Sequence, residues 1–172
     1  SDLAEKIDYL KIRVAEKIIE HTHWPDRQHT HFTIAVLDPS KRSQHLISQI
    51  FKGKKPLNKP VKMASIESAE DIQDFFHVIY IARAHLQNHP EILAKAIGKP
   101  ILVITDSLTS NNKPMANVYY RDNNVGFEIN QKKILQQGLR VDDVVLVLGA
   151  DRGEIKALME QKEKKLNTVR EE

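Results

Sequence analysis

Two His-x-His pairs are the densest set of side chains in this chain that could do chemistry. His21 and His23 form the first pair, and His29 and His31 form the second, on either side of a Trp-Pro dipeptide. Imidazole nitrogens bind zinc and copper, and they titrate near neutral pH. The alternative is a polar helix-to-strand connection that is rich in histidine without binding a metal, because short His-rich tracts predict metal sites only loosely. The sequence leaves both interpretations open.

Polar side chains also follow three of the apolar segments that are predicted to be strands. They are Asp38 and Ser40 after residues 32–37, Arg83 after residues 78–82, and Asp106 and Ser107 after residues 101–105. Open α/β sheets bind ligands at the carboxyl ends of their parallel strands, so these five residues could line one polar crevice. The alternative is that they cap the turns and helices that follow, which is a routine role of Asp and Ser at strand ends.

Several well-known catalytic and phosphate-binding motifs are absent from the sequence. The segment after the first predicted strand, residues 38–43, contains no glycine, so a dinucleotide pyrophosphate would find no close backbone approach there. The chain also has no Walker-type loop, no Gly-x-Ser-x-Gly and no His-Glu-x-x-His. A small α/β hydrolase or nucleotide enzyme using Asp38, Arg83 and Asp106 is therefore an alternative that these absences disfavour.

Glu128 is a carboxylate within an otherwise apolar strand, since apolar and other residues alternate over 125–129. It could be a general acid or base, a ligand contact, or one partner of a buried pairing with a positive group or the backbone. Buried carboxylates are normally paired, which favours the last interpretation. Asn130 stands where a helix N-cap belongs, and Gly138 stands where a helix end needs positive φ. Trp24 could stack on a ligand, but a core anchor is the more common role of such a residue.

The spacing of apolar residues predicts the elements that must position these groups. Helical spacing predicts an amphipathic helix over 3–20, which Trp24-Pro25 should end. Strands then alternate with helices, which indicates a parallel α/β sheet. An added antiparallel hairpin is expected, because Asp and Asn at its turn tolerate left-handed backbone. The predicted strands are 32–37, 61–64, 78–82, 101–105, 116–120 and 125–129, and the predicted helices are 41–52, 68–74 and 90–97. The segment 143–148 fits either a strand or a helix.

Composition places the chain among globular proteins. Its 172 residues favour one main domain, taken here as 1–150, with 41% apolar and 28% charged residues. The net charge of +3 is too small and too evenly spread to indicate nucleic acid binding. Absence of cysteine excludes disulfides and thiolate sites. Residues 151–172 are predicted to be a helical tail, which is either a solvated helix or a coiled-coil linker to a downstream region. The predicted fold is thus a Rossmann-like mixed sheet flanked by helices, with a helical tail.

Several short motifs between residues 10 and 149 occur together. They are a helix leading into Trp24-Pro25, Gly98-Lys99-Pro100-Ile101-Leu102 with Asp106, Met115 with Asn117, Phe127-Glu128-Ile129-Asn130, and Gly138-Leu139-Arg140. In this combination the chain resembles the YfiR/HmsC-like family of bacterial periplasmic regulatory domains. Lys113-Pro114 departs from the paired glycines of that family, so the loop before Met115 should be shaped differently here.

The resemblance implies a periplasmic module without catalysis and without a cofactor. Members of this family act as signal-input or repressor proteins in cyclic-di-GMP pathways by binding a membrane diguanylate cyclase, and similar domains are fused to sensor histidine kinases. We therefore expect a sensory domain, anchored through a longer membrane protein such as a kinase, or else a free periplasmic repressor. A homodimer through helices is expected, and no nucleic acid partner. A metal-binding sensor stays open through the histidines.

Overall fold

The computed structural model describes residues 2–25 and 28–148, and it contains a six-stranded sheet in the order β3-β2-β4-β5-β6-β7. The strands from β3 to β6 are parallel, and β7 pairs with β6 in the antiparallel direction. This is the mixed sheet that the sequence predicts. A separate pairing joins β1 to β8. The strands are β1 Thr22–His23, β2 Phe32–Leu37, β3 Val61–Ser65, β4 Val78–Ile81, β5 Leu102–Asp106, β6 Ala116–Arg121, β7 Asn124–Ile129 and β8 Arg140–Val141.

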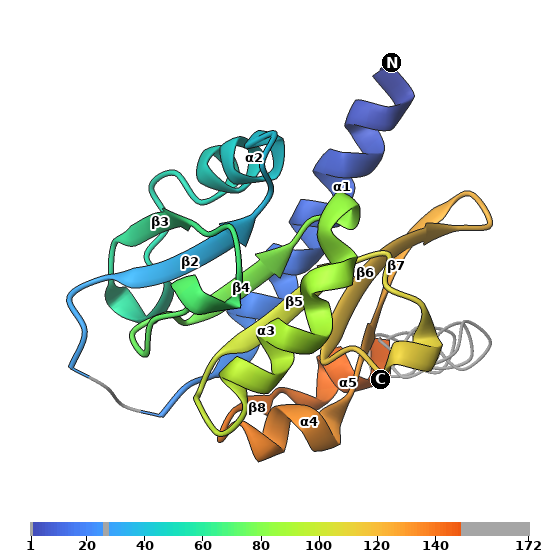
Figure 1. Ribbon diagram of the computed structural model, residues 1–172. Coiled ribbons are helices and arrows are strands. Elements are labelled where there is room, and N and C mark those ends of the chain that lie inside the picture. Colours follow the sequence, from blue (N-terminus) through green and yellow to red (C-terminus); the bar gives the residue numbers. More distant parts are fainter. Residues whose placement is uncertain (1, 26–27, 149–172) are drawn as a thin grey trace, which may run out of the picture.

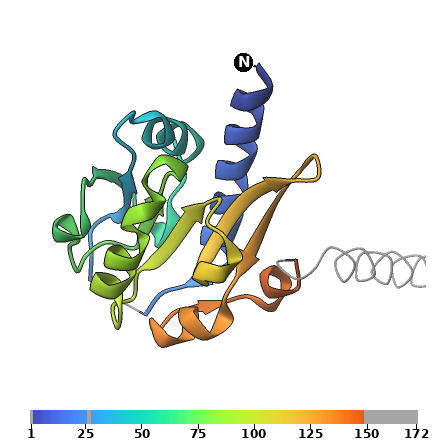
Figure 2. The ribbon, with the colours of Figure 1, turned by 45° about the vertical axis from the view of Figure 1, so that its right-hand side comes forward.

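Helices flank the sheet on both faces, as Figures 1 and 2 show. The long helix α1 passes behind the sheet in the view of Figure 1 and contacts α2, whereas α3 lies in front of it. The α-helices are α1 Asp2–Glu20, α2 Arg42–Ile50, α3 His89–Ala96, α4 Gln131–Gln136 and α5 Asp143–Leu148. Short 3-10 turns are η1 Pro56–Asn58, η2 Ala69–Asp71, η3 Arg83–Asn88 and η4 Ser110–Asn112.

Successive strands of the chain are added first on one side of β2 and then on the other, so the strand order reverses at β2. The chain places β3 on one side of β2 and then returns to place β4 on the other side. The five parallel strands therefore follow the doubly wound order 2-1-3-4-5, in which ligands bind where the carboxyl ends of the two diverging strands separate. That point lies between the ends of β2 and β4.

The central strands form the core. Every residue of β2, β4 and β5 is buried, as continuous apolar runs in a parallel sheet predict. The hairpin turn between β6 and β7 also follows its sequence: Asp122 and Asn123 have φ of 52° and 63°, the left-handed conformation that both residue types tolerate.

Only part of the apolar stripe that the helical spacing of α1 predicts is buried. Within the predicted set of Leu3, Ile7, Leu10, Val14 and Ile18, the last is buried and Val14 packs against the core, whereas Leu3 and Leu10 are 64% and 49% exposed. The rest of the docked face consists of residues that the stripe did not include, such as Ile12 and Ala15. The buried side of the helix also includes the charged residues Lys11 and Glu16. Arg13 and Lys54 form ion pairs with Glu16, which compensates the buried carboxylate.

Helix α1 ends at Glu20, as the predicted range 3–20 requires, because His21 begins a turn and the next two residues pair with β8. The helix predicted over 68–74 is wrong, since this segment contains only the 3-10 turn η2 Ala69–Asp71. The ambiguous segment at 143–148 is the helix α5. The tail predicted for 151–172 lies outside the described residues. No helix in the described ranges is both long enough and apolar enough to cross a membrane.

Candidate functional site

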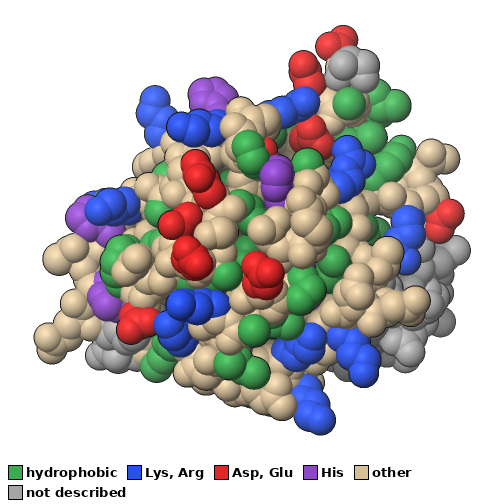
Figure 3. All heavy atoms as spheres, viewed as in Figure 1, with side chains coloured by type: hydrophobic (Ala, Val, Ile, Leu, Met, Phe, Trp, Pro, Cys, Tyr) green, Lys and Arg blue, Asp and Glu red, His purple; other side chains and the backbone are tan. Residues whose placement is uncertain are grey.

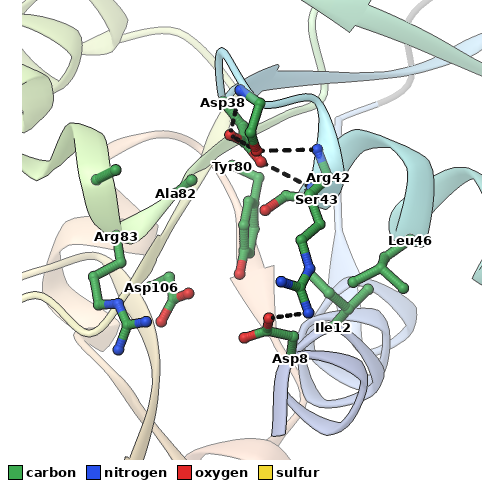
Figure 4. A pocket seen from close by; sticks show the side chains of 12 residues that line it. Asp8, Ile12, Asp38, Arg42, Ser43, Leu46, Tyr80, Ala82, Arg83 and Asp106 are labelled. Atoms are coloured by element: carbon green, nitrogen blue, oxygen red, sulfur yellow. Dashed lines mark hydrogen bonds and ion pairs between the residues drawn. The ribbon is translucent and has the colours of Figure 1, made fainter. Parts of the chain in front are cut away.

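A crevice with a volume of about 170 Å³ opens at the reversal point of the sheet. Four of the five predicted crevice residues line it, namely Asp38, Ser40, Arg83 and Asp106. The fifth, Ser107, lies beside them, and its hydroxyl donates to Asp106 Oδ1 at 2.7 Å. The structure therefore brings the ends of β2, β4 and β5 together, as their position at one edge of a parallel sheet requires. Figure 4 shows this arrangement.

Asp38 caps the start of α2 and lines the crevice at the same time. Its carboxylate accepts hydrogen bonds from the Ser40 and Ser43 amides at 3.0 and 2.8 Å, and from the Ser40 hydroxyl at 2.7 Å. Burial alone would raise the pKa of the Asp38 carboxyl, but the hydrogen bonds from Ser40 and Ser43 outweigh it and hold the pKa below its usual range. The carboxylate thus already occupies the anion-binding position at the first turn of α2, where a phosphate would otherwise sit.

The first helix forms one wall of the crevice, which the sequence did not predict. Asp8 lines it and forms an ion pair with Arg42 at 2.9 Å, and the Lys11 ammonium lies 2.9 Å from Asp106 Oδ1. Lys11 is only 2% exposed. The sequence carried one signal for this pair. Lys11 lies next to Ile12, which is buried when the helix docks, and a buried lysine needs a carboxylate partner.

Tyr80 stands within the crevice and was also missed, because in sequence it is one more large residue of a buried strand. Figure 4 shows its ring between the two sides of the crevice. Burial raises the pKa of the Tyr80 phenol well above its usual range, and the carboxylates of Asp106, Asp8 and Asp38 raise it further. The phenol therefore stays protonated over the physiological range.

The lining of the crevice contains no evident catalytic arrangement. It includes two serines, Ser40 and Ser43, but no histidine among the residues described. The Ser40 hydroxyl donates a hydrogen bond to the Asp38 carboxylate, which holds the hydroxyl as part of a cap. A nucleophile activated by an adjacent base is therefore not found in the described part of the crevice. The chemistry that the lining offers is recognition by hydrogen bonds and charge.

The two His-x-His pairs lie in different surroundings. His21 Nδ1 and His23 Nε2 meet the two oxygens of Asp142 at 3.1 and 2.7 Å, and Arg140 approaches the same carboxylate at 3.6 Å. Hydrogen bonds from His23 and then His21 hold the pKa of the Asp142 carboxyl below its usual range. We call this set the clasp, because it ties the end of α1 to the start of α5.

The second pair does not join the first. His29 packs its ring edge-on to buried His77, with centroids 5.6 Å apart, and His31 contacts the Thr30 hydroxyl. Within residues 2–25 and 28–148, no group of three or more histidine or carboxylate side chains is placed to hold a metal ion. The four imidazoles are thus not gathered into a common site.

Trp24 is a packing anchor of this region. Its ring meets Phe32 edge-on at 5.2 Å, and its indole N–H donates to the His77 carbonyl oxygen at 3.1 Å. Both ends of the indole are therefore used within the protein, with the apolar body on the core and the N–H on a backbone acceptor. Pro25 next to it is exposed.

Glu128 lies opposite Asn117 in the hairpin of β6 and β7, and the Asn117 side-chain N–H donates to Glu128 Oε1 at 3.0 Å. Asn117 is fully buried, accepts from the Thr105 hydroxyl and donates to the Leu108 carbonyl. Glu128 thus belongs to a network that ties the hairpin to the loop after β5. The partner seen here is a side-chain amide, whereas we expected a positive group or the backbone.

The helix after this hairpin begins and ends as its sequence predicts. The Asn130 side chain accepts from the Lys133 amide at 3.1 Å, so it is the N-cap of α4. Gly138 has φ of +75° and allows the Leu139 amide to reach the Ile134 carbonyl, which completes a Schellman ending.

On the face that Figure 3 shows, Lys and Arg side chains are interspersed with acidic and neutral ones. Acidic side chains gather near the middle of this view, and many of the basic ones lie toward its rim. This face therefore presents mixed charge rather than a continuous basic surface of the kind that follows a nucleic acid backbone.

Comparison with known proteins adds a family and a fold. A family model described as YfiR/HmsC-like matches residues 8–150. A crystal structure of a conserved domain protein from Vibrio cholerae O1 biovar El Tor has a TM-score of 0.52 at 10% identity and covers 83% of this chain. The chain in turn spans only 59% of that protein, and at this identity the likeness concerns the fold alone. No curated protein matches the chain significantly.

Proposed function

We propose that this chain, which belongs to the YfiR/HmsC-like family of periplasmic regulatory domains, is the non-catalytic input module of a longer signalling protein such as a sensor histidine kinase. The observation that carries the proposal is the position of α1, which borders the crevice near its middle and reaches the clasp at its end. A change at the crevice would thereby reach the segment that continues into α5.

The contacts of α1 at the crevice support such coupling. The helix supplies two charged side chains there, Asp8 to Arg42 at the start of α2 and Lys11 to Asp106 at the end of β5. A ligand that enters the crevice must compete with these pairs or rearrange them. Since packed helices move as rigid units, a shift of α1 at the crevice would also move its last turn.

The clasp supplies the second half of the coupling. His21 and His23 follow the last turn of α1, and Asp142 precedes the first residue of α5, so the clasp joins two helices that are far apart in sequence. Its contacts are partly exposed, so they can break at small cost. We expect the clasp to adopt one geometry when the crevice holds a ligand and another when it does not. The difference would be transmitted through α5 to the chain that follows it.

A reversible disulfide across β1 and β8 tests this mechanism. Thr22 and Val141 are paired residues of the two strands and lie outside the clasp, and the chain has no cysteine of its own. We expect Thr22→Cys/Val141→Cys, introduced into the signalling protein of which this domain is part, to hold the output constant when oxidised. Reduction should restore the response to stimulus. The measurement is kinase or reporter activity in both redox states.

A second pair serves as the control for this experiment. Tyr120 and Val125 are paired near the tip of the β6–β7 hairpin, which its own turn already joins. Oxidised Tyr120→Cys/Val125→Cys should leave the response intact. A full response from the oxidised β1–β8 variant would contradict the mechanism, because the clasp could then not be the moving connection.

One observation favours a second candidate function, a free periplasmic repressor of a membrane diguanylate cyclase. Leu3 and Leu10 form an exposed apolar stripe on α1, and such a stripe on a helix is a common docking surface. Under this hypothesis Leu3→Glu/Leu10→Glu should abolish capture of the periplasmic domain of the cyclase while the domain stays folded. Unchanged capture would contradict it. The proposed homodimer through helices would use the same stripe, so sedimentation of this variant tests that proposal in parallel.

A further inference from the structure

The buried tyrosine of the crevice is not satisfied by the protein. Tyr80 is 2% exposed, yet its side chain lines the crevice, and Figure 4 shows the hydroxyl directed between Asp8 and Asp106. None of the described residues forms a hydrogen bond with this hydroxyl. A tyrosine whose ring is buried usually finds a hydrogen-bond partner for its hydroxyl, and here the hydroxyl is left open to the crevice. Its orientation therefore points to a partner that enters the crevice.

The two carboxylates beside this hydroxyl each have an oxygen to spare. Lys11 and the Ser107 hydroxyl both contact Oδ1 of Asp106, and Arg42 contacts Oδ2 of Asp8. The other oxygen of each, Asp106 Oδ2 and Asp8 Oδ1, is not used by these contacts and can serve as an acceptor. Asp38, by contrast, has both oxygens engaged as a cap. The crevice thus offers two carboxylate acceptors and one hydroxyl at its centre.

Three carboxylates, of Asp106, Asp8 and Asp38, lie near the hydroxyl, and after burial itself they raise the pKa of the phenol. Lys11 and Arg42 balance two of these charges through their ion pairs with Asp106 and Asp8. Arg83 also lines the crevice, but its side chain is exposed and lies on the outer side of Asp106 in Figure 4. A group with several N–H donors would satisfy these acceptor oxygens, whereas a carboxylate anion has no hydrogen to donate to them.

We propose that the crevice binds a small organic cation through an ammonium group, which donates to Asp106 Oδ2, Asp8 Oδ1 and Tyr80 Oη. This assignment rests on the proposed function, since it names the class of signal for the same crevice. A bare metal ion fits less well, because the described residues include no set of three ligands at metal-binding positions. The volume of about 170 Å³ limits the bound part to a few non-hydrogen atoms.

Titration with propylammonium chloride, followed by the amide signals of the crevice in NMR spectra, tests the proposal. We expect saturable shifts at residues of the crevice, and no comparable shifts with acetate or with tetramethylammonium, which lacks N–H donors. Tyr80→Phe removes only the hydroxyl and should weaken propylammonium binding about three- to tenfold, the effect of one hydrogen bond. Tyr9→Phe, an exposed tyrosine on α1, is the matched control and should bind as the unmodified protein does.

Equal affinity of Tyr80→Phe and the unmodified protein for propylammonium would overturn the assignment, and so would binding of acetate in place of propylammonium. Absence of any propylammonium binding would also overturn it, while the proposed input function would stand, since that function does not depend on the class of ligand. Conversely, propylammonium binding at the crevice without any change in the signals of His21 and His23 would support the site and count against the coupling.

Discussion

Lys11 and Asp106 form a buried ion pair that joins the first helix to the end of β5, with 2.9 Å between the ammonium nitrogen and Oδ1. The two residues are 95 positions apart in sequence, and neither would be compensated without the other. The pair fixes the position of α1, which forms one wall of the crevice, relative to the end of β5. It also supplies the first testable consequence of the structure.

Removal of one partner of this pair should be costly. We expect Lys11→Met to lower the free energy of unfolding by about 3 kcal/mol, because it leaves the Asp106 carboxylate buried without its counter-charge. The measurement is urea denaturation at neutral pH. Lys17→Met is the matched control: Lys17 pairs with Glu20 at 3.4 Å on the exposed side of the same helix, and its loss should cost less than about 1 kcal/mol.

Asn117 should be one of the most sensitive positions of the hairpin. All the hydrogen-bonding capacity of its amide is used, by Thr105, Leu108 and Glu128. Asn117→Ala should destabilise the protein by roughly 2–4 kcal/mol, because it leaves several buried polar groups unpaired. Asn124→Ala, at the exposed turn of the same hairpin, should cost under about 1 kcal/mol when both variants are compared by urea denaturation. Equal losses would contradict the network.

The clasp should contribute to stability at mild pH and lose its contribution in acid. Hydrogen bonds from His23 and His21 depress the pKa of Asp142, so folding favours its ionised form. That contribution is present above the ordinary value of 3.8 and is lost as the pH falls through the lower folded-state value. We therefore expect Asp142→Asn to have a lower Tm than the unmodified protein at pH 6. The difference should shrink at pH 3.

The adjacent carboxyl group provides the comparison for this measurement. Asp143 is exposed in the first turn of α5 and has no contact with either histidine of the clasp. The Tm of Asp143→Asn should differ from that of the unmodified protein by the same amount at pH 6 and at pH 3. If the Tm of Asp142→Asn differed from that of the unmodified protein by the same amount at pH 6 and at pH 3, the folded structure would not stabilise the ionised form of Asp142.

Gly138 is a position where backbone conformation alone sets the cost of substitution. Its φ is +75°, and a Cβ built on it meets nothing within 4 Å. Gly138→Ala should therefore lower stability by about 1–2 kcal/mol through left-handed strain and not through a clash. Gly138→Asn should cost less, because asparagine tolerates this conformation. If both substitutions were neutral in denaturation experiments, the Schellman ending of α4 would not need a glycine.

The sequence by itself determined the elements whose signals are local. The apolar runs of β2, β4 and β5 specified buried parallel strands, Asp122 and Asn123 specified the hairpin turn, and a cap and a glycine bounded α4. Each of these features depends on residues within a few positions of one another, so spacing and residue type suffice to predict it. The alternation of strands and helices also indicated a parallel sheet, in which the carboxyl ends of the strands lie at one edge. The polar residues that follow those strands were therefore predicted to line a crevice.

Only the tertiary structure decided which face of α1 is buried and which charges it pairs. Leu3 and Leu10 share the helical period of Ile18, and only the docking of the helix on the sheet decides that Ile18 is buried while the two leucines are exposed. The same docking brings Lys11 to Asp106 and places the end of the helix, with His21, beside Asp142. Contacts between residues about 100 positions apart depend on how whole elements pack, and no local pattern in the chain records that arrangement.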